Sequence, residues 1–277
     1  MTGAEISAFL KARRARLTPA EVGLPPVPGR RRVPGLRREE LAQLAGLSVD
    51  YYVQLEQGRR PRASDAVLDA LARALRLTPV EREHLGTLTA AGATRPALGP
   101  AAGGAAGSAQ AAGGTAARAG SGLSAAHHLQ PLLDLLDRVP AIVLGRRMDV
   151  MAWNNAADAV FDFASWSSAP PNGAREVFRR PNARERYPDW KHLAEEVVAN
   201  LHLDAGRHPT DRRLSALVGE LSVASDEFRQ LWARYDVRRK DAGPSRLVHP
   251  LVGELAFAYR ALSAQSSKDE LLMTYTY

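Results

Sequence analysis

The residues best suited to chemistry in this 277-residue chain are cationic and hydroxyl side chains between positions 36 and 62. A guanidinium group binds a phosphate through paired hydrogen bonds, and a hydroxyl at a helix N-terminus lies beside backbone donors that attract anions. A basic cluster of this kind suits a nucleic-acid backbone. The residues that we expect to contact phosphates are Arg37, Arg38, Ser48, Arg59 and Arg60.

A second group of side chains shares the outward face of the helix expected after Ser48. Bases in the major groove are read by donors, acceptors and apolar groups carried along one helical face. The residues that we expect to approach the bases are Val49, Asp50, Tyr51 and Gln54.

Two short helices must position both groups. Helix-forming residues run from Arg37 to Ala45, and Gly46 stands where a left-handed residue can end a helix. Ser48 is a good N-cap for a second helix, which Gly58 ends. The pattern predicts a helix-turn-helix whose second helix enters the major groove. The alternative is a helical hairpin that only packs.

Further helices are expected to complete an N-terminal domain over residues 1–92. Ser64 and the pair Thr78 and Glu81 are typical N-capping signals. Besides the two helices above, we expect helices over residues 5–16, 65–75 and 79–91, which gives an all-α five-helix domain.

Positive charge is concentrated in this domain. The chain has a net charge of +7 and a pI of about 10.0. Residues 1–92 hold 15 basic and 10 acidic residues, a net of +5, whereas residues 93–277 hold 22 and 20, a net of +2. Binding to phosphates should therefore weaken as salt rises. Arg30, Arg31 and Arg32 could contact a phosphate or the minor groove, or could lie in a solvated loop.

Several classes of site are excluded by composition and motif. The chain has no cysteine, so it has no disulfide, thiolate zinc site or cysteine nucleophile. We find no Gly-x-Ser-x-Gly, His-Glu-x-x-His or Walker-type motif, and expect a protein that is not an enzyme and holds no cofactor or metal. No signal peptide or membrane-length apolar run occurs, so a cytoplasmic, nucleoid-associated location is expected.

Residues 93–122 are rich in alanine and glycine and nearly lack large apolar residues. Such a segment buries too little surface to fold alone, so we interpret it as a flexible linker. A slack tether of this kind transmits orientation poorly.

Residues 123–277 are predicted to form an α+β domain. Segments 141–144 and 148–153 flank a turn, as in a β-hairpin. Strands are also expected near the C-terminus, so one sheet should join both ends of the domain. The remaining expected elements are strands over 246–249, 251–260 and 271–277, a helix that begins near Ala156, and helices over 129–138, 189–203, 211–221 and 225–234.

Local motifs in both domains resemble known families. The N-terminal motif resembles the helix-turn-helix domain of the XRE family. Gly35–Ala42 and Leu55–Arg59 are similar to the corresponding segments of MmyB-like transcription regulators. The C-terminal segments that resemble the ligand-binding domain of that family are Asp149–Ala157, Tyr187–Trp190, Gly206–Pro209, Phe228–Arg238 and His249–Glu254.

This resemblance implies a PAS-like sensor domain that controls DNA affinity in response to a small molecule, and fatty-acyl-type ligands are associated with the family. It also implies that Glu56 pairs with a first-helix arginine, for which Arg14 is the candidate. Double-stranded DNA, a small-molecule effector and a second copy of the chain are the expected partners, since dimers bind two-fold operators.

Pocket residues are expected where segments converge at the sheet and carry a mixture of apolar and polar groups. Core packing is the alternative role for each of them, and Arg146 and Arg147 could hold a carboxylate or lie in a solvated turn. Two other functions remain open for this domain: it could only dimerise or dock a protein partner, or it could carry an enzymatic site. The candidate pocket residues are Trp153, Asn154, Phe178, Trp190, Trp232 and His249.

Overall fold

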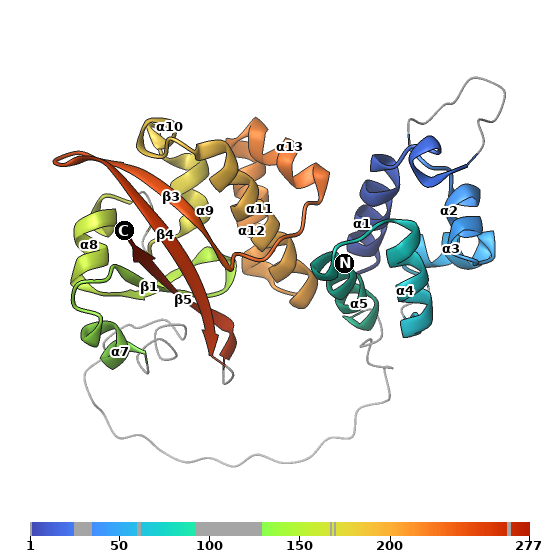
Figure 1. Cartoon of the computed structure of the whole chain (residues 1–277), viewed down its shortest axis with the longest axis horizontal. Coiled ribbons are helices and arrows are strands. Elements are labelled where there is room, and N and C mark those ends of the chain that lie inside the picture. Colours follow the sequence, from blue (N-terminus) through green and yellow to red (C-terminus); the bar gives the residue numbers. More distant parts are fainter. Residues whose placement is uncertain are drawn as a thin grey trace, which may run out of the picture.

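The chain folds into two lobes, a helical N-terminal lobe and a C-terminal lobe in which helices cover a sheet (Figure 1). This arrangement confirms the predicted combination of a helical domain and an α+β domain. The linker expected over residues 93–122, Arg30–Arg32 and Arg60 lie outside the residues that can be described. The computed structural model describes residues 2–24, 35–59, 62–91, 129–166, 168, 170–264 and 267–277.

Helices of the N-terminal lobe pack around one apolar core. Phe9, Leu41, Tyr52 and Leu71 are completely buried in it. The α-helices are α1 (Thr2–Arg16), α2 (Arg38–Leu44), α3 (Val49–Glu56), α4 (Asp65–Ala74) and α5 (Pro79–Ala91), with a 3₁₀ turn at Ala20–Val22.

Local capping determines where these helices begin. The Ser48 hydroxyl accepts a hydrogen bond from the Tyr51 amide at 3.2 Å, and that of Ser64 accepts one from Val67 at 3.4 Å. Thr78 and Glu81 form a reciprocal capping box, in which the Thr78 amide donates to the Glu81 carboxylate at 2.7 Å. The capping signals predicted from sequence are therefore confirmed.

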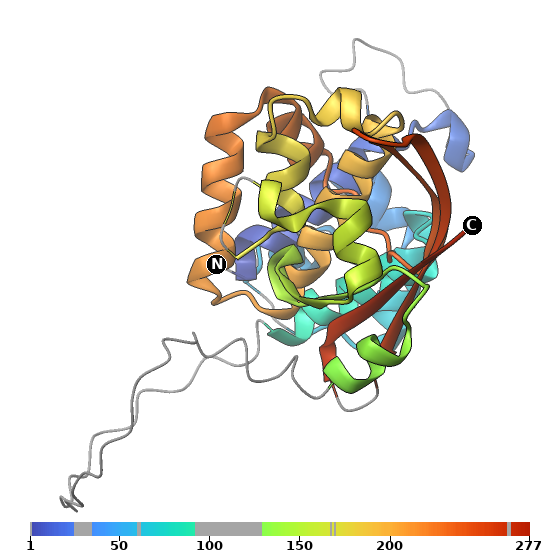
Figure 2. The same cartoon turned by 90° about the vertical axis from the view of Figure 1, so that its left-hand side faces the viewer.

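One antiparallel sheet organises the C-terminal lobe, in the order β2-β1-β5-β4-β3. The predicted N-terminal hairpin forms, and its first strand pairs with the last strand of the chain, so the sheet joins both ends of the domain as expected. Figure 2 shows the sheet curving around one side of the helices. The strands are β1 (Ala141–Leu144), β2 (Val150–Trp153), β3 (Ala242–His249), β4 (Gly253–Ala264) and β5 (Ser267–Thr276).

The two faces of the central strands are buried against different helices. Ile142 of β1 and its neighbour Met273 of β5 point into the main core. Val143 and its neighbour Leu272 lie on the opposite face, where Leu133 of the short helix α7 (Gln130–Leu135) covers them. Burial on both faces explains why residues 141–144 are a continuous apolar run.

The main core lies between the sheet and a layer of helices. The long helix α11 packs against α9 and α13, and α12 packs against the same two helices. No helix among the described residues has the length and apolar character needed to cross a membrane. Besides α7, the helices are α8 (Asn155–Phe161), α9 (Gly173–Arg179), α10 (Ala183–Arg186), α11 (Trp190–Arg207), α12 (Arg212–Ala224) and α13 (Asp226–Arg234), with 3₁₀ turns at Arg146–Met148 and Phe163–Ser165.

Strand bounds and two short helices of this lobe differ from the sequence prediction, and β5 begins at Ser267, four residues earlier than expected. Strand β3 begins at Ala242, four residues earlier than expected, because an edge strand tolerates Gly243 and Pro244. The short helices α9 and α10 were not predicted, since each has too few turns to show a clear apolar period.

Candidate DNA interface and ligand cavity

The start of α3 is positioned by a tight turn and a cap. Gly46 has a φ of +64°, a left-handed conformation that glycine adopts without strain and that ends α2. Two residues later Ser48 caps α3. Tyr52 and Leu55 then anchor one face of α3 in the core. This geometry is that of a helix-turn-helix.

The opposite face of α3 carries the predicted base-contacting residues. Val49 is 38% exposed, and Asp50 and Gln54 are also exposed, whereas Tyr51 is half-buried against the core. Figure 1 shows α2 and α3 on the side of the N-terminal lobe that lies away from the C-terminal lobe. The outward face of α3 is therefore not covered by the described part of the C-terminal lobe.

A buried carboxylate fixes the other end of α3. Glu56 is completely buried and accepts hydrogen bonds from Arg38 at 2.8 and 2.9 Å, from the Tyr52 hydroxyl at 2.8 Å and from Arg14 at 3.3 Å. Burial alone would raise the pKa of Glu56, but the hydrogen bonds from Arg38 and Tyr52 and the charge of Arg14 outweigh it and lower that pKa. The implied Arg14–Glu56 pair is confirmed, and it ties α3 to α1.

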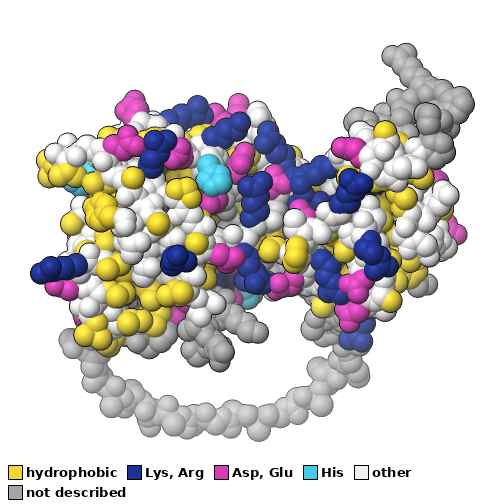
Figure 3. Space-filling view, viewed as in Figure 1, with side chains coloured by type: hydrophobic (Ala, Val, Ile, Leu, Met, Phe, Trp, Pro, Cys, Tyr) yellow, Lys and Arg dark blue, Asp and Glu magenta, His cyan; other side chains and the backbone are white. Residues whose placement is uncertain are grey.

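The predicted phosphate-contacting residues have different environments. Arg37, Ser48 and Arg59 are exposed around α2 and α3. Arg38 is bound to Glu56 while 42% of its side chain remains exposed, so its first role is to position α3. In the view of Figure 3, basic side chains are frequent over the N-terminal lobe and the helices beside it, with acidic ones among them, whereas apolar side chains are most frequent on the sheet side.

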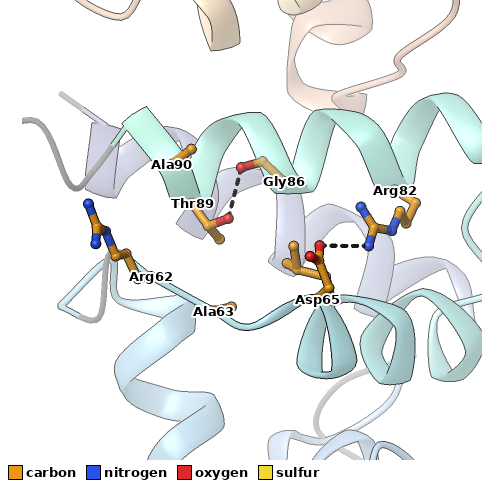
Figure 4. Close-up of a pocket in the computed structure, with 8 residues that line it drawn as sticks. Arg62, Ala63, Asp65, Arg82, Gly86, Thr89 and Ala90 are labelled. Carbon is orange, nitrogen blue, oxygen red and sulfur yellow. Dashed lines mark hydrogen bonds and ion pairs between the residues drawn. The ribbon is translucent and has the colours of Figure 1, made fainter.

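An open hollow with a volume of about 520 Å³ lies in the N-terminal lobe, between α4 and α5 (Figure 4). It is open to solvent. Arg82, in its wall, is paired with Asp69 at 2.9 Å and Asp65 at 3.1 Å. Because this cation already has two carboxylate partners, we do not assign the hollow to an anionic ligand.

A smaller and more apolar cavity lies inside the C-terminal lobe, between the sheet and α9 and α11. Its volume is about 70 Å³. Ligand pockets usually measure about 300–1,000 Å³, so a larger ligand requires the walls to move apart. The apolar part of the wall consists of Ile142, Leu144, Met148, Phe161, Phe163, Trp166, Val177, Leu193, Val197 and Tyr275.

Lys240 lies in a wall that this cavity shares with a neighbouring hollow, which Glu196 and Tyr259 also line. Its side chain is only 9% exposed, and its ammonium lies 3.3 Å from the Glu196 carboxylate and 4.7 Å from the centre of the Tyr259 ring. Burial lowers the pKa of Lys240, partly offset by Glu196. Glu196 also accepts a hydrogen bond from the Tyr259 hydroxyl at 2.7 Å. Such a partly compensated cation can bind a carboxylate.

Glu176 is a carboxylate in the wall of the cavity. It is 2% exposed, and one carboxylate oxygen is bound by Arg180 at 2.8 Å and by the Tyr187 hydroxyl at 3.1 Å. The other oxygen, Oε2, has no hydrogen-bond partner among the described residues. Sequence reasoning missed both Glu176 and Lys240. Lys240 was missed because it stands in a charged run that resembles a solvated loop.

The six pocket residues predicted from sequence are not among those that line this cavity. Asn154 is instead structural: its side chain caps α8 through the Ala157 amide at 2.9 Å and also accepts from the Ala141 amide at 3.1 Å. His249 lies at the end of β3, where its Nδ1 accepts a hydrogen bond from the Leu251 amide at 3.2 Å.

The four aromatic residues of that set pack in or against the core. Trp153 packs on Phe163 with the ring centres 4.6 Å apart. Phe178 and Trp190 meet edge to face at 5.9 Å, and Trp232 stacks on His202 at 3.8 Å. These positions agree with the core-packing alternative. A single sequence does not show which aromatic side chains border a void.

Arg146 and Arg147 both bind carboxylates of the protein itself. Arg146 pairs with Asp211 at 2.5 Å, and Arg147 pairs with Asp211 at 2.8 Å and with Asp149 at 2.9 Å. These contacts join the β1–β2 turn to the start of α12. The two guanidinium groups thus have structural partners, and the carboxylate that they hold is Asp211.

Comparison with known families gives two matches. Residues 125–277 match the MmyB-like transcription regulator ligand binding domain, and residues 5–85 match a helix-turn-helix domain. The first match alone covers more than half of the chain. No curated protein sequence matches the chain at a significant level.

Proposed function

The chain belongs to the MmyB-like transcription regulators, and we propose that it binds a specific operator through α3 and is regulated by an acyl-type molecule in its C-terminal cavity. A DNA-binding regulator with a ligand-binding domain follows from the two family matches. The operator contacts, the ligand class and the oligomeric state are the proposed parts.

The observation that carries the DNA-binding part is the position of α3. It is held by Glu56 on one side and presents exposed Val49, Asp50 and Gln54 on the other. We assign base reading to these residues with Tyr51. Contacts to phosphates supply most of the affinity, whereas contacts to base edges supply sequence preference. The phosphate contacts are assigned to Arg37, Ser48, Arg59 and Arg60, and Arg38 joins them through the exposed part of its side chain.

The proposed ligand has an apolar chain and a carboxylate. The apolar wall suits the chain, and Lys240 suits the carboxylate. Since the cavity measures about 70 Å³, a medium-length acyl chain would have to displace side chains of the wall. Met148 and Trp166 are good candidates for this movement, because methionine is flexible and Trp166 is only partly buried.

We further propose that the protein acts in the cytoplasm as a homodimer. It regulates by binding DNA and a ligand and does not catalyse a reaction. One short recognition helix reads few base pairs, so a second copy is needed for a specific operator.

A fluorescence titration tests the ligand assignment. Trp166 borders the cavity, so decanoate should change the tryptophan emission of the full chain, and Trp166→Phe should remove most of that change. Val197→Phe, which fills the cavity, should weaken decanoate binding at least about fivefold, since overpacking costs about 1–3 kcal/mol.

Val223→Phe is the matched control, because Val223 is 87% exposed on α12 and lies away from the cavity wall. Equal decanoate affinity in the Val197 and Val223 variants would contradict the proposed site. Decanoate binding that leaves operator affinity unchanged would contradict the regulatory role.

A further inference from the structure

The two lobes contact each other directly through a buried apolar surface. Leu203, Tyr235 and Val237 of the C-terminal lobe belong to the same buried cluster as Phe9 and Leu85 of the N-terminal lobe. This contact places α5 against α11.

The approach of α5 to α11 is close enough to require a glycine. A Cβ atom placed on Gly206 of α11 would lie 2.4 Å from a ring carbon of His84 of α5. His84 and Tyr235 also form an aromatic contact, with ring centres 5.9 Å apart. Packing this tight defines one arrangement of the lobes.

Residues 235–240, which we call the connector, run from α13 to β3 along the side of the lobe that faces α1 and α5 (Figure 1). The connector is bound to the N-terminal lobe at its start. The carbonyl oxygen of Tyr235 accepts a hydrogen bond from the buried Arg13 guanidinium at 2.5 Å, and its hydroxyl donates to Glu5. Asp236 pairs with Arg16 and lies 3.6 Å from Arg13.

The next connector residues continue this contact. Val237 is 3% exposed within the N-terminal core cluster. Arg239 binds Glu83 of α5 at 2.5 Å. Four of the six connector residues are thus fixed to the DNA-binding lobe by a hydrogen bond, an ion pair or burial, namely Tyr235, Asp236, Val237 and Arg239.

The last connector residue is Lys240, which lies in the wall of the ligand cavity beside Glu196. A fully extended chain spans at most about 3.6 Å per residue, so no more than about 18 Å of backbone joins Tyr235 to Lys240. The cavity cation and the anchor of the DNA-binding lobe are therefore on one short segment.

We propose that the connector couples the occupancy of the cavity to the position of the DNA-binding lobe, with the Lys240–Glu196 pair as its ligand-sensitive end. A ligand carboxylate bound to Lys240 competes with Glu196 and displaces the chain next to Arg239. Displacement there weakens the Arg239–Glu83 and Val237 contacts. This inference rests on the proposed ligand cavity.

Coupling through the connector changes the orientation of the DNA-binding lobe relative to the C-terminal lobe. It does not uncover the outward face of α3. The outward face of α3 lies away from the sensor lobe in the docked arrangement (Figure 1). A ligand therefore acts by favouring one arrangement of the lobes over another, as two-state coupling requires. Direct docking also supplies a route for the signal that a slack tether would not.

The absence of native cysteine allows a distance measurement on the full chain. Spin labels on Ala66→Cys in α4 and Ala216→Cys in α12, both exposed positions, report the separation of the lobes by pulsed electron paramagnetic resonance. The parent should give one narrow distance distribution. Lys240→Met, which removes the cation without touching the DNA-binding lobe, should shift or broaden it, and saturating decanoate should do the same to the parent.

Lys191→Met is the matched control, since Lys191 is exposed at the start of α11, and it should leave the distribution unchanged. If Lys240→Met does not fold, Glu196→Gln keeps the side-chain volume, removes the charge partner and should also shift the distribution. Folded Lys240 and Glu196 variants with the parent distribution would overturn the proposal.

Val237→Asp separates two ways in which the proposal can fail. It should broaden the distribution by breaking the docked surface. A broadened Val237→Asp with unchanged Lys240→Met means that docking is real but not linked to the cavity, and an unchanged Val237→Asp means that the lobes are not docked. Either result overturns the connector. The distance between the lobes is measured without DNA. A failure of operator binding therefore does not affect the distance distribution of either variant.

Discussion

Glu56 should be the polar residue on which the position of α3 depends most. Replacing it by alanine removes four hydrogen bonds and leaves the fully buried Tyr52 hydroxyl without its acceptor. Breaking a buried ion pair costs about 3–5 kcal/mol. The side chains of Arg14 and Arg38 are 15% and 42% exposed and can regain water, so we expect a loss of about 3 kcal/mol in the free energy of unfolding.

Urea unfolding followed by circular dichroism at pH 7 measures this loss. Glu254→Ala is the matched control, because Glu254 is half-exposed and its pair with Arg246 at 3.1 Å should contribute less than about 1 kcal/mol. Glu56→Ala and Glu254→Ala variants of equal stability would refute the role given to the buried carboxylate.

The pH dependence of the same variant provides a second check. The folded-state pKa of Glu56 is lowered from its usual 4.5, mainly by Arg38, Tyr52 and Arg14 against the opposing effect of burial. The stabilisation is therefore complete above pH 4.5 and is lost as the pH falls through the lowered folded value. The difference between parent and Glu56→Ala should shrink in that range, and a constant difference would contradict this explanation.

Three further predictions concern stability. Burial lowers the pKa of His84 and of His202 from 6.5 to about 3. At pH 5 each histidine is therefore protonated only in the unfolded or undocked protein, which should lower the free energy of unfolding by about 2 kcal/mol per histidine. Thermal unfolding of a His84→Gln variant that shows the same loss of stability between pH 7 and pH 5 as the parent would contradict this. Asn154→Ala should lower the free energy of unfolding in urea by about 2 kcal/mol, because it removes the helix cap and the contact with β1. The affinity for decanoate should stay unchanged. A loss of decanoate binding without a loss of stability would show that Asn154 belongs to the ligand site. Gly46→Ala should destabilise the protein by about 1 kcal/mol because of the positive φ at this position. Gly219→Ala should stabilise it by up to about 1 kcal/mol, since Gly219 lies inside α12 with open space at the Cβ position. Melting temperatures that change in the same direction in both variants would refute the backbone explanation.

Local chemistry explains which features could be predicted from the sequence. Ser48, Gly46 and the Thr78–Glu81 box act within a few residues of themselves, so their effects on α2, α3 and α5 are visible in the chain. The pairing of the first and last strands was predictable from apolar segments at both ends of one domain. Arg14 and Glu56 were paired through resemblance to a family.

Features that depend on distant segments could not be predicted in this way. The cavity is bordered by residues from strands, turns and helices over more than 130 positions, and the aromatic residues that looked suitable fill the core beside it. The connector is a charged run whose burial depends on contacts with Arg13 and Glu83, more than 150 residues away. Nothing in its own composition indicates that Val237 and Lys240 are buried.

The central claim is that the outward face of α3 reads base sequence while the arginines around it hold the backbone. Selection of preferred sites from a pool of randomised duplexes, with the parent, Gln54→Ala and Arg59→Ala compared, tests it most directly. Gln54→Ala should change the preferred base at a fixed position of the site, with about 1–3 kcal/mol of discrimination lost there. Arg59→Ala should select the parent's site, bind all duplexes more weakly and reduce the salt dependence by about one phosphate contact. An unchanged site preference for Gln54→Ala, with the same uniform loss in both variants, would contradict the claim.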